Sequence, residues 1–310
     1  MPIDPLTQLC GIVTVLNTPF LDDDSIDVKG LAANVNHAIE AGVAGFLVPA
    51  KAGEVEKLSE TERALVVETV ASTCAGRVPI VGGAWAATGE ERQRIVRSLM
   101  RSGCAGVLLN IPYENDDQYR RDVMEIAALD PGFIMLQDWD FGGYGLPLPL
   151  IVSLFETVPS FRCLKIEVVP AGAKYSETIA ATGGRLHVSG GWAVSQMIEG
   201  LDRGVHAFMP TGMHWIYTTI YRLFASGDRT GAQALFNRLL PVLAFSNQHL
   251  DISVHFFKRL LHAQGTFATS RVREPVAKFD AFHEKSAREC IELVQTMEAE
   301  IRGATMALNL

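Results

Sequence analysis

The sequence predicts an α/β fold, a (β/α)8 TIM barrel with a C-terminal helical extension. Eight short runs are apolar at nearly every position, which is typical of parallel strands buried on both faces. Amphipathic segments with helical spacing alternate with these runs. One junction also recurs, in which glycine ends a helix and small residues lead into a strand: AGVAGFLVP, SGCAGVLLN and RGVHAFMPT. Repeated αβ units of this kind favour the barrel.

The strands and helices can be assigned in chain order. The eight predicted strands span residues 11–16, 43–48, 78–82, 106–111, 133–139, 163–168, 186–189 and 207–210. The helix predicted at 26–40 places Leu31 and Val35 on one face, and the helix at 88–101 begins with Thr88 as its cap. A doubly wound open sheet is the alternative, but no G-x-G-x-x-G follows the first strand.

The chain divides into two predicted parts. We expect residues 1–230 to form the barrel and residues 231–310 to form a helical extension packed on it. Three helical patterns support the extension, at 235–245, at 252–263 and, with a polar face, near 284–302. No linker or low-complexity segment separates the two parts.

Composition excludes several classes of partner. The 310-residue chain carries a formal net charge of −8, which argues against nucleic acid and against a basic membrane-binding surface. No apolar stretch is long enough to span a membrane, and MPIDPLTQLC does not resemble a secretory signal. The five cysteines are scattered without C-x-x-C pairs, which is typical of a reduced cytoplasmic protein and argues against a zinc site. We expect no cofactor.

One lysine stands in the middle of an apolar strand, RCLKIEVV. Lys165 and Glu167 share one face of this sixth strand, because side chains alternate with period two. The apolar Leu164 and Ile166 suit the helix-facing side, so Lys165 points into the barrel. A desolvated lysine can hold a neutral amine, which attacks a carbonyl to form a Schiff base. The alternative is a lysine paired with a carboxylate inside a polar layer of the barrel.

Several short motifs occur in the order and spacing of a known family. They are T-P-F (18–20), G-E (53–54), P-Y (112–113), the x-K-x-E around Lys165, S-G-G (189–191) and a helical region at 222–241. On these motifs the chain resembles the dihydrodipicolinate synthase/N-acetylneuraminate lyase family of class I aldolases and dehydratases. The resemblance implies a barrel that is usually tetrameric. It also implies that Lys165 forms a Schiff base with pyruvate or another 2-oxo acid.

The loop after the second strand departs from that family. The family reads G-T-T-G-E where this chain reads A-K-A-G-E, so Lys51 and Ala52 replace two threonines. The resemblance implies that backbone N–H groups of Ala52 and Gly53 bind a substrate carboxylate, beside Glu54. Lys51 is predicted either to favour the neutral amine of Lys165 by like-charge repulsion or to anchor a substrate carboxylate. The alternatives are a salt bridge from Lys51 to Glu54 or Glu114, or simple exposure at a loop.

The loop after the fifth strand departs further. The family reads Y-N-V-P-G-R, where the tyrosine passes protons and the arginine grips a carboxylate. Here Gln137 and Gly142 stand at those positions, and glutamine is no acid or base near pH 7. Proton transfer then falls to Glu114, Asp138 or Asp140. A regular strand cannot turn both Gln137 and Asp138 inward.

Other residues near strand ends carry weaker predictions. Gly191, in the loop after the seventh strand, is assigned to substrate binding. Four tryptophans near strand ends either line a pocket for a bulky or aromatic substrate or pack in the core or an interface: Trp85, Trp139, Trp192 and Trp215. Three histidines near strands seven and eight lack the spacing of metal ligands and are expected to be structural: His187, His206 and His214.

The sequence therefore predicts a Schiff-base-forming lyase, an aldolase or dehydratase, that acts on a small-molecule 2-oxo acid. Its predicted catalytic residues are Lys165, Gln137 and Glu114. The replaced relay residues argue against authentic dihydrodipicolinate synthase activity. Two alternatives remain, a barrel that binds a 2-oxo acid without turnover and a structural oligomer with Lys165 in an internal ion pair. The resemblance implies a homotetramer or a dimer.

Overall fold

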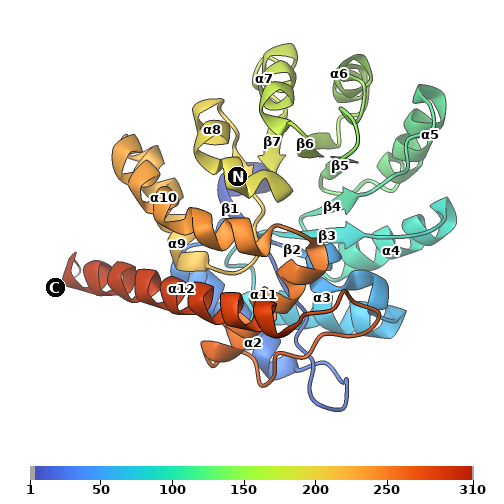
Figure 1. Ribbon diagram of the computed structural model, residues 1–310. Helices are drawn as coiled ribbons and strands as arrows, with labels where there is room; N and C mark the ends of the chain where they lie inside the picture. Colours follow the sequence, from blue (N-terminus) through green and yellow to red (C-terminus); the bar gives the residue numbers. More distant parts are fainter. Residues whose placement is uncertain (1–3, 309–310) are drawn as a thin grey trace. The chain divides into compact units, whose positions relative to one another are not determined.

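The computed structural model describes residues 4–308, and its eight strands form a closed barrel in the order β1 to β8 (Figure 1). Strands pair in parallel from β2 through β8, and β8 pairs with β1. The predicted fold class is confirmed. The strands are β1 (Gly11–Val15), β2 (Gly45–Val48), β3 (Ile80–Ala84), β4 (Gly106–Leu109), β5 (Ile134–Asp140), β6 (Phe161–Val168), β7 (His187–Gly190) and β8 (Ala207–Phe208).

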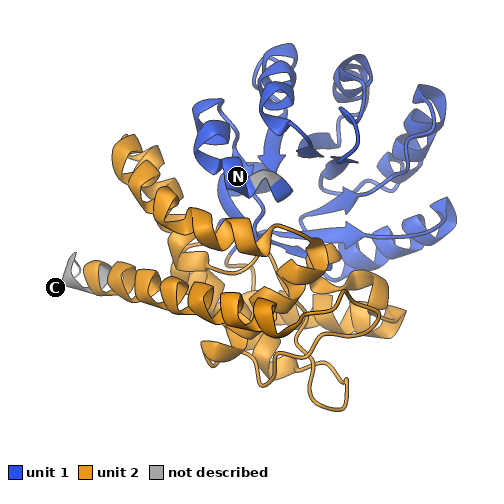
Figure 2. Cartoon of the chain, in the orientation of Figure 1, with its two compact units in different colours: residues 1–13, 44–49, 78–210 blue, residues 14–43, 50–77, 211–310 orange. Residues whose placement is uncertain are grey.

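The chain forms two compact units, coloured separately in Figure 2. Unit 1 comprises residues 1–13, 44–49 and 78–210, and it holds the strands apart from the last two residues of β1. Within it, helices α4 to α8 lie on the outer side of the strands (Figure 1). Its helices are α1 (Pro5–Gln8), α4 (Gly89–Arg101), α5 (Asp116–Ala127), α6 (Leu148–Thr157), α7 (Ala171–Ala181), η3 (Trp192–Gln196) and α8 (Met197–Asp202).

Local sequence explains the elements of unit 1. Strand residues are buried on both faces, and Leu164 and Ile166 of β6 are fully buried. Such burial accounts for apolar runs without the alternation of a half-exposed strand. Helix α4 begins where predicted, because the Thr88 side chain accepts a hydrogen bond from the Glu91 N–H at 3.2 Å.

Unit 2 comprises residues 14–43, 50–77 and 211–310 and is mainly helical. The three helices predicted near the C-terminus correspond to α10, α11 and α12, whereas the predicted boundary at residue 230 stays a prediction. Within residues 4–308, no helix has both the length and the apolar character needed to cross a membrane. The helices of unit 2 are α2 (Val28–Ala41), η1 (Lys51–Gly53), η2 (Val55–Lys57), α3 (Glu60–Cys74), α9 (His214–Ala225), α10 (Arg229–Ser246), α11 (Leu250–Ala263) and α12 (Ala281–Leu308).

Candidate functional site

A buried ion pair lies on the inner face of strand β6. Lys165 Nζ lies 2.9 Å from Glu167 Oε2, and the two residues are 5% and 4% exposed. On the neighbouring strand β5, Gln137 stands in register with Lys165. The pairing of Lys165 with Glu167 agrees with the predicted shared face, since residues two apart on a strand point the same way. We call Lys165 and Glu167 the inner pair.

The carboxylate of Glu167 is held by two further donors. Gln137 Nε2 donates to Oε2 at 2.5 Å, and the backbone N–H of Trp192 donates to Oε1 at 3.0 Å. Asn110 Nδ2 in turn donates to Gln137 Oε1 at 3.2 Å, which orients the amide so that its nitrogen faces Glu167. Gln137 therefore acts on the inner pair by fixing the position of the carboxylate.

Gly191 allows the loop after β7 to approach the inner pair closely. A Cβ atom at this position would lie 2.0 Å from Glu167 Oε1 and 2.7 Å from Lys165 Cε. Any side chain at position 191 would displace one of the two charged groups. Gly191 therefore lies against the inner pair, and its assignment to substrate binding stays a prediction.

A second buried ion pair lies on the opposite, helix-facing side of the same strands. Asp138 Oδ2 lies 2.6 Å from Lys174 Nζ of α7, and each side chain is 1% exposed. The Leu146 N–H donates to Asp138 Oδ1 at 2.8 Å, and Lys174 also donates to the carbonyls of Leu146, at 2.8 Å, and Tyr144. Burial raises the pKa of the Asp138 carboxyl above its ordinary value, against the attraction of Lys174. We call Asp138 and Lys174 the outer pair.

The three carboxylates predicted for proton transfer lie in different surroundings. Asp138 belongs to the outer pair and so faces away from Lys165. Asp140 accepts hydrogen bonds from the N–H groups of Gly142 and Gly145 at 3.0 and 3.1 Å, which braces the turn after β5. Glu114 is exposed in the loop before α5. Among the contacts of the described residues, neither Asp140 nor Glu114 is a partner of Lys165.

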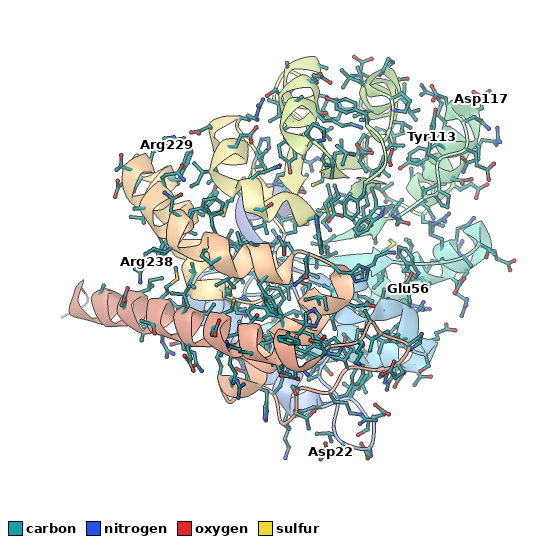
Figure 3. The ribbon with its side chains drawn as sticks, in the orientation of Figure 1. Asp22, Glu56, Tyr113, Asp117, Arg229 and Arg238 are labelled. Atoms are coloured by element: carbon teal, nitrogen blue, oxygen red, sulfur yellow. The ribbon has the colours of Figure 1, made fainter. Side chains whose placement is uncertain are left out.

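Tyr113 lies in the loop between β4 and α5. This residue is 45% exposed, and its hydroxyl donates to Asp116 Oδ1 at 2.8 Å. Figure 3 shows it near the start of α5. Hydrogen bonding to Asp116 raises the pKa of Tyr113, which weakens it as an acid.

Lys51 lies in η1 of unit 2. Its Nζ is 3.6 Å from Glu56 Oε1, and both side chains are partly exposed. Figure 3 labels Glu56. A salt bridge was one alternative predicted for Lys51, but with Glu54 or Glu114 as its partner. Its proposed influence on Lys165 and its role as a carboxylate anchor stay predictions.

The carbonyls of the same turn are fixed by side chains of unit 2. Asn17 Nδ2 donates to the Ala52 carbonyl at 2.8 Å, and Thr18 Oγ1 donates to the Gly53 carbonyl at 2.7 Å. The Gly53 N–H donates to the Ala50 carbonyl at 2.9 Å. The binding of a substrate carboxylate by Ala52 and Gly53 stays a prediction.

Glu54 is buried within unit 2 and holds several groups together. Its Oε1 contacts Lys258 Nζ, and its Oε2 accepts from Lys57 Nζ at 3.2 Å and from the Arg273 N–H at 3.1 Å. Burial lowers the pKa of Lys258 to about 8. These contacts account for the burial of Glu54, and its predicted part in substrate binding stays a prediction.

Three aromatic rings lie next to one another at the ends of β5 and β7. The ring centroids of Trp139 and Phe141 are 4.7 Å apart, and those of Phe141 and Trp192 are 5.9 Å apart. Phe141 is 44% exposed, and both tryptophans are partly exposed. Trp139 stands in register with Glu167. We call these three residues the aromatic rim.

The two histidines of unit 1 contact each other, and one of them contacts Cys163 of β6. His187 Nδ1 is 3.1 Å from Cys163 Sγ, and its ring stacks on His206 with centroids 4.9 Å apart. Burial lowers the pKa of His187 to about 3, so the ring is neutral near pH 7. In residues 4–308, no group of three or more His, Cys, Asp or Glu side chains could hold a metal ion.

Sequence reasoning missed three parts of this arrangement. It gave no role to Asn110 or Lys174, and it placed Glu167 beside Lys165 without assigning it to the site. The signal for Glu167 was present in the period-two spacing. Asn110 and Lys174 required knowledge of the strand register and of the packing of α7.

Comparisons with known proteins agree on one family. The model of the Dihydrodipicolinate synthetase family matches residues 8–294. The 4-hydroxy-tetrahydrodipicolinate synthase of Methanosphaerula palustris is 35% identical over 89% of this chain and 96% of its own length. The synthase of Methanothermobacter thermautotrophicus is 33% identical, over 35% of this chain and 38% of its own.

Solved structures show the same fold. Dihydrodipicolinate synthase from Rhodopseudomonas palustris superposes with a TM-score of 0.85 at 22% identity, covering 92% of this chain and 98% of that one. A catalytic lysine mutant of the Ruminococcus gnavus sialic acid aldolase gives a TM-score of 0.85 at 15% identity, covering 96% and 99%.

Proposed function

The chain belongs to the dihydrodipicolinate synthetase family of lyases, and from that premise we propose that Lys165 forms a Schiff base with a 2-oxo acid. The observation that carries the proposal is the inner pair. A lysine ammonium has three hydrogens to donate, and among the described residues the acceptor of Lys165 is Glu167 Oε2. Lys165 is therefore buried but still has N–H hydrogens that can bond to the oxygen of an incoming carbonyl.

The inner pair contains the groups that Schiff-base formation needs. Transfer of one proton from Nζ to Oε2 leaves a neutral amine beside a carboxylic acid. The amine attacks C2 of the 2-oxo acid, a proton moves from nitrogen to oxygen, and Glu167 returns its proton as the hydroxyl leaves as water. Of the three ammonium hydrogens, two leave with the carbonyl oxygen and one stays on the iminium nitrogen.

In this proposal Glu167 takes the proton-transfer role for which Glu114, Asp138 and Asp140 were candidates. Gln137 and the Trp192 N–H hold the carboxylate in place, so Gln137 is a positioning residue. The iminium then serves as the electron sink for breaking a carbon–carbon or carbon–oxygen bond, which is lyase chemistry. Because Gln137 replaces the tyrosine of the family's relay, we propose a reaction other than that of dihydrodipicolinate synthase.

Borohydride trapping tests the Schiff base. The protein is incubated with pyruvate, 2-oxobutanoate or 2-oxoglutarate and reduced with borohydride, and its intact mass is then measured by mass spectrometry. We expect an adduct with at least one acid, mapped to Lys165 by peptide mass, and none with Lys165→Arg. Lys29→Arg, which changes an exposed lysine of α2, is the matched control and should form the adduct as the wild type does. A folded wild type without any adduct would contradict the proposal.

Glu167→Gln separates chemistry from binding. The amide keeps the shape of the side chain but cannot carry the proton, so we expect trapping at least about a hundredfold slower, a typical general acid–base contribution. Adduct formation without any turnover in the wild type would favour the second candidate, a non-catalytic 2-oxo-acid-binding barrel. The absence of the family's tyrosine at position 137 is the observation that keeps this candidate open.

A further inference from the structure

We propose that the aromatic rim binds an aromatic or extended apolar tail of the 2-oxo acid, and so sets the substrate class. This inference rests on the proposed function, because the tail belongs to the molecule whose carbonyl meets Lys165. The rim consists of Trp139, Phe141 and Trp192, from the segments that follow or end β5 and β7.

The rim adjoins the inner pair on two sides. Trp139 follows Gln137 by two residues on β5, so the two share the inner face, and Trp139 stands in register with Glu167. Trp192 donates its backbone N–H to Glu167 Oε1 at 3.0 Å. Phe141 contacts both indoles, at centroid separations of 4.7 and 5.9 Å. A substrate attached to Lys165 and extending past Glu167 would therefore meet these rings.

The ring of Phe141 is held in an exposed position by a braced loop. It is 44% exposed, although the turn around it is fixed by hydrogen bonds from Gly142 and Gly145 to Asp140. The outer pair holds the same loop, because Lys174 binds the carbonyl of Leu146. An apolar ring fixed in solvent costs free energy that a bound apolar group would recover.

Charge around the rim also favours an apolar tail. The chain contains no Lys or Arg in residues 110–116, which follow β4, or in residues 137–147 and 189–196, which cover the ends of β5 and β7 and the loops after them. Those segments instead carry carboxylates at Glu114, Asp116 and Asp140, besides Asp138, which faces the helices in the outer pair. A second substrate carboxylate would meet negative groups and aromatic faces, whose electrostatic character repels anions. Aromatic rings accept another ring in offset or edge-on geometry at comparable centroid separations.

Matched ligands test the inference. Half-saturating concentrations for trapping are measured with 2-oxobutanoate, 4-phenyl-2-oxobutanoate and 2-oxoglutarate, which share the reacting carbonyl and differ in the tail. We expect the phenyl compound to half-saturate the wild type at about tenfold lower concentration than 2-oxobutanoate, about 1.4 kcal/mol, with 2-oxoglutarate the weakest. In Phe141→Ala and Trp192→Ala, the half-saturating concentrations of 4-phenyl-2-oxobutanoate and 2-oxobutanoate should become nearly equal.

Tyr144→Ala is the matched control. Tyr144 belongs to the same loop and is 43% exposed, but its hydroxyl donates to Glu177 of α7 at 2.9 Å, away from the rim. We expect this variant to keep the wild-type ratio of the two half-saturating concentrations. The inference would be overturned if the wild type half-saturated at equal concentrations of 4-phenyl-2-oxobutanoate and 2-oxobutanoate, or preferred 2-oxoglutarate. It would also be overturned if Phe141→Ala kept the wild-type preference for the phenyl compound.

A second measurement keeps the test independent of Schiff-base formation. Binding of 4-phenylbutanoate and butanoate, which lack the reacting carbonyl, is followed by tryptophan fluorescence. If no 2-oxo acid is trapped but 4-phenylbutanoate binds and Phe141→Ala weakens it, the proposed function fails and the rim stands. If neither ligand binds, the rim inference fails. A change in molar mass of Phe141→Ala by light scattering, with an unchanged ligand ratio, would assign the rim to contacts between copies and overturn it as well.

Discussion

Strands β5 and β6 carry a buried lysine–carboxylate pair on each face, and the two pairs differ in how completely the lysine is satisfied. In the outer pair, Lys174 Nζ donates to the carbonyls of Tyr144 and Leu146 and forms an ion pair with Asp138 Oδ2. In the inner pair, the acceptor of Lys165 among the described residues is the Glu167 carboxylate. The inner carboxylate, rather than the inner lysine, has the additional donors.

This contrast separates a structural pair from a reactive one. Lys174, whose ammonium contacts two carbonyls and a carboxylate, links the loop to α7 and has no N–H group left for a substrate. A lysine with spare capacity beside a rigidly held carboxylate is arranged for proton exchange and attack on a carbonyl. Burial alone therefore does not identify the reactive lysine, because the outer pair is the more deeply buried of the two.

The largest stability effect is expected at the outer pair. Lys174→Met should lower the free energy of unfolding by about 3–5 kcal/mol, because it leaves the Asp138 charge and two carbonyls buried without their partner. Lys165→Met should cost less, since Glu167 keeps the hydrogen bonds from Gln137 and Trp192. Urea unfolding of both variants measures the difference. An equal cost would remove the distinction between the pairs.

The stability of the protein at acid pH, and so the pH range in which the two pairs can be compared, should depend on His187. His187, packed against Cys163 and His206, has a pKa lowered to about 3 in the folded protein against an ordinary value of 6.5. The unfolded chain therefore takes up this proton first, and the stability gained from neutral His187 is lost as pH falls from 6.5 toward 3, by up to about 1.4 kcal/mol per pH unit. His187→Gln should lose stability less steeply over that range in urea titrations. Parallel slopes would contradict the assignment to His187.

Each pair is also approached by one glycine, which provides a matched test. Gly191→Ala would place a Cβ 2.0 Å from Glu167 Oε1, and Gly145→Ala would place one 2.1 Å from Asp138 Oδ1, with Gly145 at φ +69°. We expect Gly191→Ala to slow trapping up to about a hundredfold through misplacement of the inner pair. Gly145→Ala should instead cost about 1–3 kcal/mol of stability at a near-normal trapping rate. The reverse outcome would exchange the roles of the two pairs.

The smallest effect is expected from a third pair, on the surface at the start of β6. Arg162 Nη2 lies 2.5 Å from Asp4 Oδ2, and the side chains are 43% and 37% exposed. Arg162→Ala should cost only about 0.2–1 kcal/mol, because solvent screens exposed charges. The midpoint of thermal unfolding measures it. A loss of stability comparable to that of Lys174→Met would show that burial does not govern how much each ion pair contributes to the free energy of unfolding.

The fold was predictable because each strand repeats the same local signal. Every predicted strand overlaps an observed one, with ends that differ by a few residues. One such difference is at β8, where apolar residues continue to position 210 but the strand pairs only over Ala207–Phe208. Apolar character marks burial, whereas a strand end depends on where the partner's hydrogen bonds stop.

The site was predictable only along one strand. Spacing of two residues placed Lys165 beside Glu167, and the same rule implied that Asp138 and Gln137 face opposite ways, as they do. The partner of Asp138 could not be found in this way, because Lys174 reaches it from α7. Likewise, the contact of Asn110 with Gln137 depends on the register between β4 and β5, which local patterns do not encode.

The outer pair has one consequence for how this enzyme could change over time. Lys174 donates to main-chain carbonyls of the loop after β5, so these hydrogen bonds do not depend on the side chain of Phe141. Phe141 can be exchanged without loss of this anchor of the loop, whereas Tyr144 takes part in it, because Lys174 Nζ lies 5.2 Å from the centroid of the Tyr144 ring. A library randomised at position 141 should therefore alter ligand preference with little loss of stability, while the inner pair stays unchanged.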